Sequence, residues 1–273
     1  MESMERSKEM NSPKFAAIAL FAGTLLFSAS SLAETVQSPV GTWQVTNVSI
    51  NNQSQRTLEY QHDDDRLVGR FINVSPTGIT ADLPGGVNCS SPVFTQNNQK
   101  LDTWITQVFG EADDANAKNY RLGIAGTEKA TITAIQCKTG QITSGDSDRN
   151  VDIVFVGNKV LLNWTDGSLL ILKPVNQNTK PAASFNCEKA ATDTEKTICQ
   201  NRTLASLDAS VSRSYSGYRK EAVRLNNREL ESKLVTQQKE WLKQRNVCAS
   251  DADCLQKSMQ DRLESLSHSL DAF

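Results

Sequence analysis

Six cysteines that all follow an apolar leader constrain the fold of this chain more than any other sequence feature. Because exported proteins reach oxidising compartments, an even cysteine count after such a leader predicts disulfide bonds. Two cysteines lie in the first half of the chain after the leader and four in the last third, at positions Cys89, Cys137, Cys187, Cys199, Cys248 and Cys254. Pairing within each group leaves only Cys89–Cys137 in the first. In the second group, the positions at expected helix ends favour Cys187–Cys199 and Cys248–Cys254.

The leader has the composition of a secretory signal. Lys14 supplies a positive charge, and the apolar stretch 15–28 after it is too short to span a bilayer comfortably. Ser31 and Ala33 are small residues at the two positions that a signal peptidase reads, so we expect cleavage after Ala33 and removal of residues 1–33. An uncleaved membrane anchor is the alternative. No later segment is apolar enough to span a membrane, so we expect a periplasmic or secreted mature protein.

Strand-like alternation of apolar and polar residues fills the region 38–173. A short helix is expected over 101–109, and the turns Gly157-Asn158 and Asp166-Gly167 suit positive backbone dihedrals. Strands are expected over 43–50, 67–74, 78–83, 120–125, 130–137, 151–156, 160–164 and 169–172. Two of these pairs, 67–74 with 78–83 and 120–125 with 130–137, are expected to be hairpins. This region is therefore predicted to be an antiparallel β-sandwich or small barrel of about seven or eight strands.

Helical periodicity replaces the alternation in the region 184–273, after the polar, proline-containing stretch 174–183, which is predicted to be a linker. A capping box at Thr192 and Glu195 begins a short helix. Three longer helices follow, with apolar residues repeating every three or four positions from Leu204 to Leu225, from Leu230 to Leu242 and from Leu255 to Leu270. The chain is therefore predicted to be an α+β protein of two domains, the second a disulfide-stapled helical bundle.

The helical region also carries a spaced motif around its cysteines. Its residues include Phe185, Cys187, Glu195, Cys199, Leu207, Asp208 and Tyr215, then Trp241, Arg245, Cys248 and Cys254. With the spacing Cys-x11-Cys and a later Cys-x5-Cys after Trp-Leu-x-x-Arg, this region resembles the LprI-type lysozyme-inhibitor domain of exported bacterial proteins. The resemblance covers about a third of the chain. It implies an extracytoplasmic helical module whose named activity is lysozyme inhibition, and it supplies no inhibitory residues.

Two polar residues of the motif invite both a functional and a structural interpretation. Asp208 and Arg245 fall on or beside apolar helix faces, so they form either a binding epitope or an interhelical ion pair beside Trp241. The structural interpretation is preferred, because a charge beside an apolar face needs a partner. Trp241 is likewise expected in the core. Gly41-x-Trp43 resembles the opening of lipocalin-like barrels, although one Gly-x-Trp is weakly specific.

Catalytic and cofactor-binding patterns are missing from the sequence. The chain has two histidines, no Cys-x-x-Cys, no Gly-x-Ser-x-Gly, no glycine-rich phosphate loop and no His-Glu-x-x-His. His62 precedes Asp63-Asp64-Asp65, for which a solvated loop is preferred over a metal or acid–base cluster, and His268 beside Ser267 and Ser269 forms no triad. We therefore expect no enzyme activity, no cofactor and no metal. Carboxylate pairs of the glycosidase type are spatial, so the sequence leaves them open.

The remaining function classes are forms of binding. The net charge of −2 gives no basic surface for nucleic acid. Residues 34–180 carry 12 Lys and Arg against 15 Asp and Glu, and residues 181–273 carry 14 against 13. We expect a protein partner, either a lysozyme or another muramidase, with electrostatic steering assigned to the acidic β-rich region and Asp63–Asp65. Immunity against a secreted toxin is a variant. The alternative is an envelope scaffold or ligand-binding protein with a lipocalin-like domain and Trp43, Trp104 and Trp164 near the ligand.

Overall fold

The computed structural model describes residues 37–269 except 111–113, 143–150 and 177. The expected signal segment and Leu270 therefore lie outside the described residues. Gln37–Phe273 group as one compact unit, and the boundaries proposed above between a β-rich domain, a linker and a helical domain stay a prediction. Within the described ranges, none of the helices is both long enough and apolar enough to cross a membrane.

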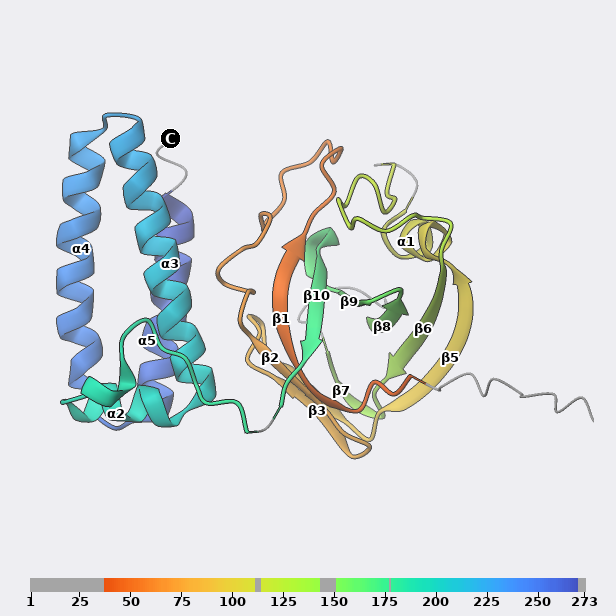
Figure 1. The fold of residues 1–273 in the computed structure, drawn as a ribbon, viewed down its shortest axis with the longest axis horizontal. Coiled ribbons are helices and arrows are strands. Elements are labelled where there is room, and N and C mark those ends of the chain that lie inside the picture. Colours follow the sequence, from red (N-terminus) through yellow and green to blue (C-terminus); the bar gives the residue numbers. More distant parts are fainter. Residues whose placement is uncertain (1–36, 111–113, 143–150, 177, 270–273) are drawn as a thin grey trace, which may run out of the picture. The chain divides into compact units, whose positions relative to one another are not determined.

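Ten antiparallel strands form one curved sheet (Figure 1). Its order from one end to the other is β5-β6-β8-β9-β10-β1-β2-β3-β4-β7. The strands are β1 (Gly41–Ser49), β2 (Phe71–Val74), β3 (Gly78–Ala81), β4 (Val87–Ser90), β5 (Val93–Lys100), β6 (Lys129–Gln136), β7 (Thr139–Gln141), β8 (Val151–Val156), β9 (Lys159–Asn163) and β10 (Leu169–Pro174). The register of β1 against β10 shifts between Val45 and Asn47, where the alternation breaks in the sequence. The α+β class predicted from the sequence is confirmed.

The sequence analysis missed three strands and was wrong about one. β5 reads Val-Phe-Thr-Gln-Asn-Asn-Gln-Lys, which lacks alternation because it is the end strand, paired on one side with β6 and mostly exposed. β4 and β7 are too short to give a periodic signal. Residues 120–125, expected as a strand, form turns in which Tyr120 and Leu122 are buried and the Tyr120 hydroxyl donates to the carbonyl of Gly167 (2.8 Å).

Two apolar cores cover the two faces of the sheet. The first contains Trp43, Phe155, Trp164 and the alternate residues of β1, β8 and β10. The second core uses the other face of β8 and β10 together with residues of β6 and β9, and α1 (Leu101–Phe109) contributes Leu101, Trp104 and Ile105. All six residues of β8 are buried because both cores use it. This is why its sequence, Val-Asp-Ile-Val-Phe-Val, is almost continuously apolar.

The Cys89–Cys137 disulfide ties the two ends of the sheet together. Cys89 lies in β4, next to the end strand β7, whereas Cys137 directly follows β6, which is second from the other end. The short connections from β4 to β5 and from β6 to β7 link the same two ends along the chain. The disulfide adds a cross-link at this point and restricts the conformations of the unfolded chain.

Four helices of the described chain follow the last strand of the sheet. They are α2 (Asp193–Gln200), α3 (Arg202–Arg224), α4 (Arg228–Val247) and α5 (Ala252–Ser267), with short 3-10 turns at Thr165–Gly167 and Cys187–Lys189. The capping box is present, because the Glu195 N–H donates to Thr192 Oγ1 and the Thr192 N–H donates to Glu195 Oε2. Disulfides join Cys187 to Cys199 and Cys248 to Cys254, the pairs favoured by their spacing.

Candidate functional site

The connection between β1 and β2 packs closely against α3. Ser206 Oγ donates to the carbonyl of Gly69 (2.6 Å), and Ser210 Oγ donates to the carbonyl of Val68 (3.1 Å). Gly69 has a φ of +90°, and a Cβ placed on it would lie 2.5 Å from Ser206 Oγ. Small serines on the helix and a glycine on the loop therefore allow two backbones to approach where larger side chains would hold them apart.

Replacing Gly69 by alanine tests this close approach. We expect the free energy of unfolding to fall by about 2–3 kcal/mol, because both the positive φ and the contact with Ser206 become unfavourable. Gly86→Ala is the matched control, since Gly86 also has a positive φ (+75°) but open space around its Cβ. It should lose only about 1 kcal/mol. Equal losses in urea unfolding would contradict the role given to the Gly69–Ser206 contact.

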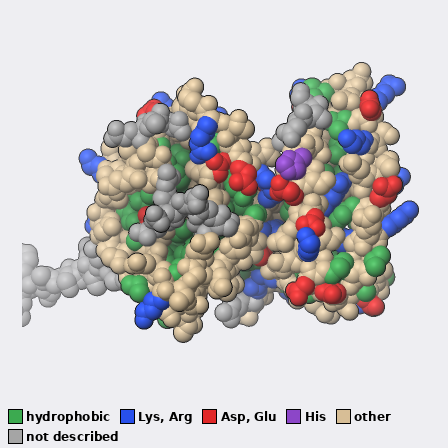
Figure 2. All heavy atoms as spheres, turned by 180° about the vertical axis from the view of Figure 1, so that it is seen from behind, with side chains coloured by type: hydrophobic (Ala, Val, Ile, Leu, Met, Phe, Trp, Pro, Cys, Tyr) green, Lys and Arg blue, Asp and Glu red, His purple; other side chains and the backbone are tan. Residues whose placement is uncertain are grey.

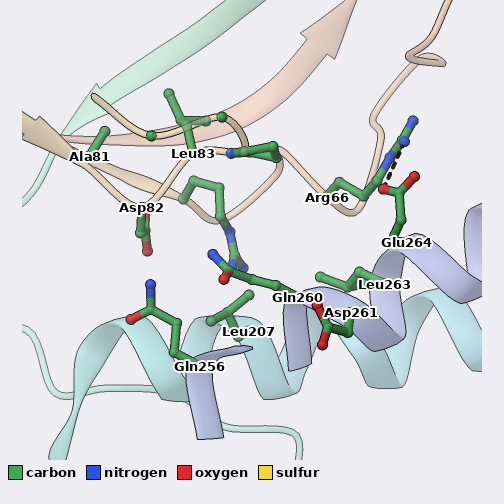
Figure 3. A pocket seen from close by; sticks show the side chains of 14 residues that line it. Arg66, Ala81, Asp82, Leu83, Leu207, Gln256, Gln260, Asp261, Leu263 and Glu264 are labelled. Carbon is green, nitrogen blue, oxygen red and sulfur yellow. Dashed lines mark hydrogen bonds and ion pairs between the residues drawn. The ribbon is translucent and has the colours of Figure 1, made fainter. Parts of the chain in front are cut away.

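A cleft of about 460 Å³ opens beside this contact (Figure 3). Arg66 and Arg70 come from the β1–β2 connection, Leu207 from α3, and the opposite side from α5. The remaining wall is the connection from β3 to β4. The full lining is Arg66, Arg70, Ala81, Asp82, Leu83, Pro84, Gly85, Gly86, Leu207, Gln256, Gln260, Asp261, Leu263 and Glu264. The cleft thus combines charges of both signs, two amides and several apolar side chains.

Arg70 is the most unusual residue of the cleft. It is 1% exposed, and its Nη2 donates to Ser206 Oγ (3.3 Å) and Ser210 Oγ (3.0 Å). Its Nε and Nη1 are buried and have no hydrogen-bond partner among the described residues. Burial lowers the pKa of Arg70 to about 10, which Asp82 partly opposes. A buried cation with unused donors is costly, on the order of 1–3 kcal/mol for each unsatisfied group.

Asp82, which also lines the cleft, has one carboxylate oxygen with a backbone partner and one without. Its Oδ1 accepts from the Phe71 N–H, whereas its Oδ2 is buried without a hydrogen-bond partner in the described part of the chain. Burial raises the pKa of Asp82, and the charge of Arg70 opposes that rise. Arg70 and Asp82 are not within ion-pair distance, since no salt bridge joins them among the described residues. A hydrogen bond with the Thr203 side chain also opposes the rise of the Asp82 pKa, so the carboxylate is partly satisfied by its surroundings.

An ion-pair network borders the cleft. Arg66 contacts Asp64 (2.9 Å) and, from the other side, Glu264 of α5 (3.2 Å), as the dashed line in Figure 3 shows. Its guanidinium also lies over the Tyr60 ring at 4.7 Å. Arg66 is therefore held in place by the sheet and by α5 at once.

The acidic cluster Asp63–Asp65 lies in the turns of the β1–β2 connection, where Asp63 is exposed and Asp64 is buried. Asp63 Oδ1 accepts from the Val48 N–H (3.1 Å), Asp64 is 3% exposed beside Arg66, and Asp65 pairs with Arg213 of α3 (3.1 Å). Because each carboxylate has an internal partner, the cluster is unavailable as a free acidic patch. This weakens the assignment of electrostatic steering to these residues.

Asp208 and Arg245 form the interhelical ion pair preferred above. Asp208 Oδ1 accepts from Arg245 Nη1 (3.0 Å), and both side chains are buried. Asp208 Oδ2 also accepts from the N–H and the hydroxyl of Ser184, which fixes the start of the helical region. Burial lowers the pKa of Arg245, and Asp208 opposes the shift. The Arg245 guanidinium lies over the Trp241 ring at 5.2 Å.

The other motif residues also belong to the helical framework. Leu207 is fully buried in the helical core, against which the half-buried Phe185, Tyr215 and Trp241 pack. Trp241 Nε1 donates to the carbonyl and the hydroxyl of Ser258 on α5 (3.2 Å each). Only Leu207 also reaches the cleft. The motif therefore builds the module, while the cleft depends on residues outside the motif.

The three tryptophans considered for ligand binding are core residues. Trp43, Trp104 and Trp164 are 6%, 1% and 4% exposed. Trp43 Nε1 donates to the carbonyl of Pro39, and Trp104 Nε1 donates to the buried Asp152 (2.7 Å). The inner face of the sheet is filled by side chains of the first core, which removes the main motivation for a lipocalin-like carrier.

Sequence reasoning did not single out the cleft residues. Arg66, Arg70 and Asp82 lie in connections without a motif, and Gln256 and Gln260 appear as ordinary exposed-face residues of a helix. A usable signal was present on α3, where Ser206, Ser210 and Ser214 repeat every four residues. Such a stripe of small polar residues on a helix is suited to close backbone approach. His62 and His268 take no part in the cleft.

These features define a disulfide-stapled α+β protein with a cleft lined by residues of its sheet connections and its helices. In the described part of the chain, no three His, Cys, Asp or Glu side chains are grouped so as to hold a metal ion. No family model matches the chain, and no solved structure matches it.

Among curated proteins, the chain is similar to Lipoprotein LprI of Mycobacterium tuberculosis and Mycobacterium bovis. The identity is 33% over 101 residues, which are 34% of this chain and 46% of LprI. The match spans less than half the length of these relatives. Likeness to a lipoprotein and the three disulfides are consistent with an exported protein.

Proposed function

We propose that this chain is an exported binding protein that inhibits a lysozyme or a related cell-wall-degrading enzyme. The observation that carries the proposal is the cleft of about 460 Å³, whose lining combines charges of both signs, two amides and several apolar side chains. A protein partner that enters the cleft would meet Gln256, Gln260 and Asp261 of α5 at its wall.

The chemistry of the cleft fits a peptide segment. A peptide group offers a carbonyl acceptor and an N–H donor. The side chains of Gln256 and Gln260 on α5 each provide a donor and an acceptor that complement such a group (Figure 3). Leu83, Leu207 and Leu263 provide apolar contact. A short exposed loop of an enzyme combines these properties, whereas a purely apolar ligand would leave the charges unmet.

The partner class comes from the resemblance of the helical region to LprI-type lysozyme-inhibitor domains and from the similarity to LprI. Asp208, Trp241 and Arg245 stabilise the helical module and lie outside the cleft. We therefore assign a structural role to the module and the selection of the partner to the cleft beside it. On the face drawn in Figure 2, basic and acidic side chains are interspersed over the helices. Because no large patch of one charge is visible on this face (Figure 2), we favour a contact based on shape and hydrogen bonds over one based on long-range charge attraction.

A panel of muramidases tests the proposal. Purified protein lacking residues 1–33 is titrated against chicken-type, goose-type and bacterial muramidases, and lysis of cell-wall suspensions is followed by turbidity. We expect saturable inhibition of at least one enzyme, with a stoichiometry of one to one. Unchanged rates for all of them at several-fold molar excess would exclude muramidase inhibition.

A further inference from the structure

A second depression at the sheet–helix junction differs from the cleft in its charge. It has a volume of about 570 Å³ and is bordered by β1, the β1–β2 connection, the segment 173–183 and α3. Its only charged lining residues are Lys173, Lys180, Arg202 and Arg213, which we call the basic groove. The cleft, in contrast, is lined by two cations and three acids. In a chain with a net charge of −2, this local excess of one sign creates a positive potential.

Two of the four cations are fixed by the surrounding structure. Arg202 Nη2 donates to the carbonyl of Thr179 (3.1 Å), and its guanidinium lies over the Phe71 ring at 5.8 Å. Arg213 is anchored by Asp65 and by Ser210 Oγ (2.9 Å). A guanidinium that is held in place loses less conformational freedom when an anion binds.

The other two cations are free to reach a ligand. Lys173 at the end of β10 and Lys180 in the following segment are exposed. Lys173 and Lys180 line the side of the groove next to the sheet, whereas Arg202 and Arg213 line the side formed by α3. Part of the charge of Arg213 is offset by Asp65, so the exposed Lys173 and Lys180 supply most of the positive charge that a ligand would meet.

We propose that the basic groove binds a linear polyanion, a chain whose repeating units carry phosphates or carboxylates. Several cations around one concave depression favour a chain that brings several anionic groups at once over a single small anion. The concave shape admits one extended chain, whereas a flat bilayer surface would reach only its rim. The proposal is independent of the inhibitor function, because it uses different residues.

Binding of two defined polymers tests the proposal. Inorganic polyphosphate and poly-L-glutamate are titrated separately into the labelled protein, and binding is followed by fluorescence anisotropy at about 50 mM and about 200 mM salt. We expect at least one polymer to bind. Its affinity should fall severalfold at the higher salt, because binding releases counterions and a higher salt concentration makes this release less favourable. The polymer that binds identifies the anion as phosphate or carboxylate.

Charge-reversal variants locate the site. Lys173→Glu/Lys180→Glu should weaken binding about tenfold or more, since two attractive contacts become repulsive. Lys239→Glu/Lys243→Glu on α4 is the matched control, because both lysines are exposed, lie outside the groove lining and change the net charge equally. Lys173→Gln/Lys180→Gln removes the charges more mildly, which guards against misfolding of the reversal. Failure of both polymers to bind, or equal weakening in the two reversal variants, would overturn the proposal, whether or not muramidases are inhibited.

Discussion

Replacing Asp208 by alanine is expected to lower the free energy of unfolding by about 3–5 kcal/mol, because it leaves Arg245 as an uncompensated buried charge. Asp208 accepts hydrogen bonds from Arg245 on α4 and from Ser184 at the start of the helical region. The substitution therefore loosens two attachments to α3 at once. Urea unfolding followed by circular dichroism measures the effect.

Two comparisons separate the ion pair from general effects of substitution. Asp208→Ala combined with Arg245→Met should recover a large part of the loss, since no charge then remains buried. Glu231→Ala breaks the more exposed pair between Arg219 and Glu231 (3.1 Å) and should cost less than about 1 kcal/mol. A loss of that small size for Asp208→Ala would show that the buried pair does not hold the module together.

Removing the Cys89–Cys137 disulfide is expected to be the most costly of the three disulfide losses. The bond closes a loop with a sequence separation of 48, against 12 for Cys187–Cys199 and 6 for Cys248–Cys254. On the chain-entropy model, replacing both cysteines by serine costs about 4, 3 and 2 kcal/mol in that order. β5 and β7 are the end strands of the sheet, and loss of the first bond also removes a cross-link beside these strand edges.

The three double-serine variants are compared by thermal and urea unfolding without reductant. The Cys89→Ser/Cys137→Ser protein should be the least stable and should also aggregate first at raised concentration. If the Cys248→Ser/Cys254→Ser protein were the least stable, the result would contradict the ranking in which the Cys89–Cys137 disulfide contributes most to stability.

The four helices of the helical half could be predicted, although their ends could not be placed to the residue. Its signals are local, since a capping box at Thr192 and Glu195 and apolar repeats from Leu204 onward depend on neighbours within a few residues. The strands with two buried faces or clear alternation, such as β8 and β1, were equally accessible. β5 was missed because a polar end strand is defined by its pairing with β6, which the local sequence does not encode.

The cleft was not predictable for a related reason. Arg70 and Asp82 line one cleft only because the β1–β2 connection, the β3–β4 connection and α5 converge in space. The motif residues, by contrast, were visible in the sequence because they maintain the module, and Asp208 with Arg245 is the clearest case. Sequence patterns thus identified residues that stabilise the helical module, and the structure was needed to find the cleft.

The most direct test of the cleft as the inhibitory site is to fill it. Gln260→Trp places a large side chain in the cleft from α5, whereas Lys243→Trp places the same side chain at an exposed position of α4 outside its lining. The half-inhibitory concentration is measured for the muramidase that the unmodified protein inhibits best. We predict a rise of about tenfold or more, at least about 1.4 kcal/mol of binding energy, for Gln260→Trp and a change within about twofold for Lys243→Trp. Inhibition by Gln260→Trp at the concentration of the unmodified protein would contradict the assignment of the cleft.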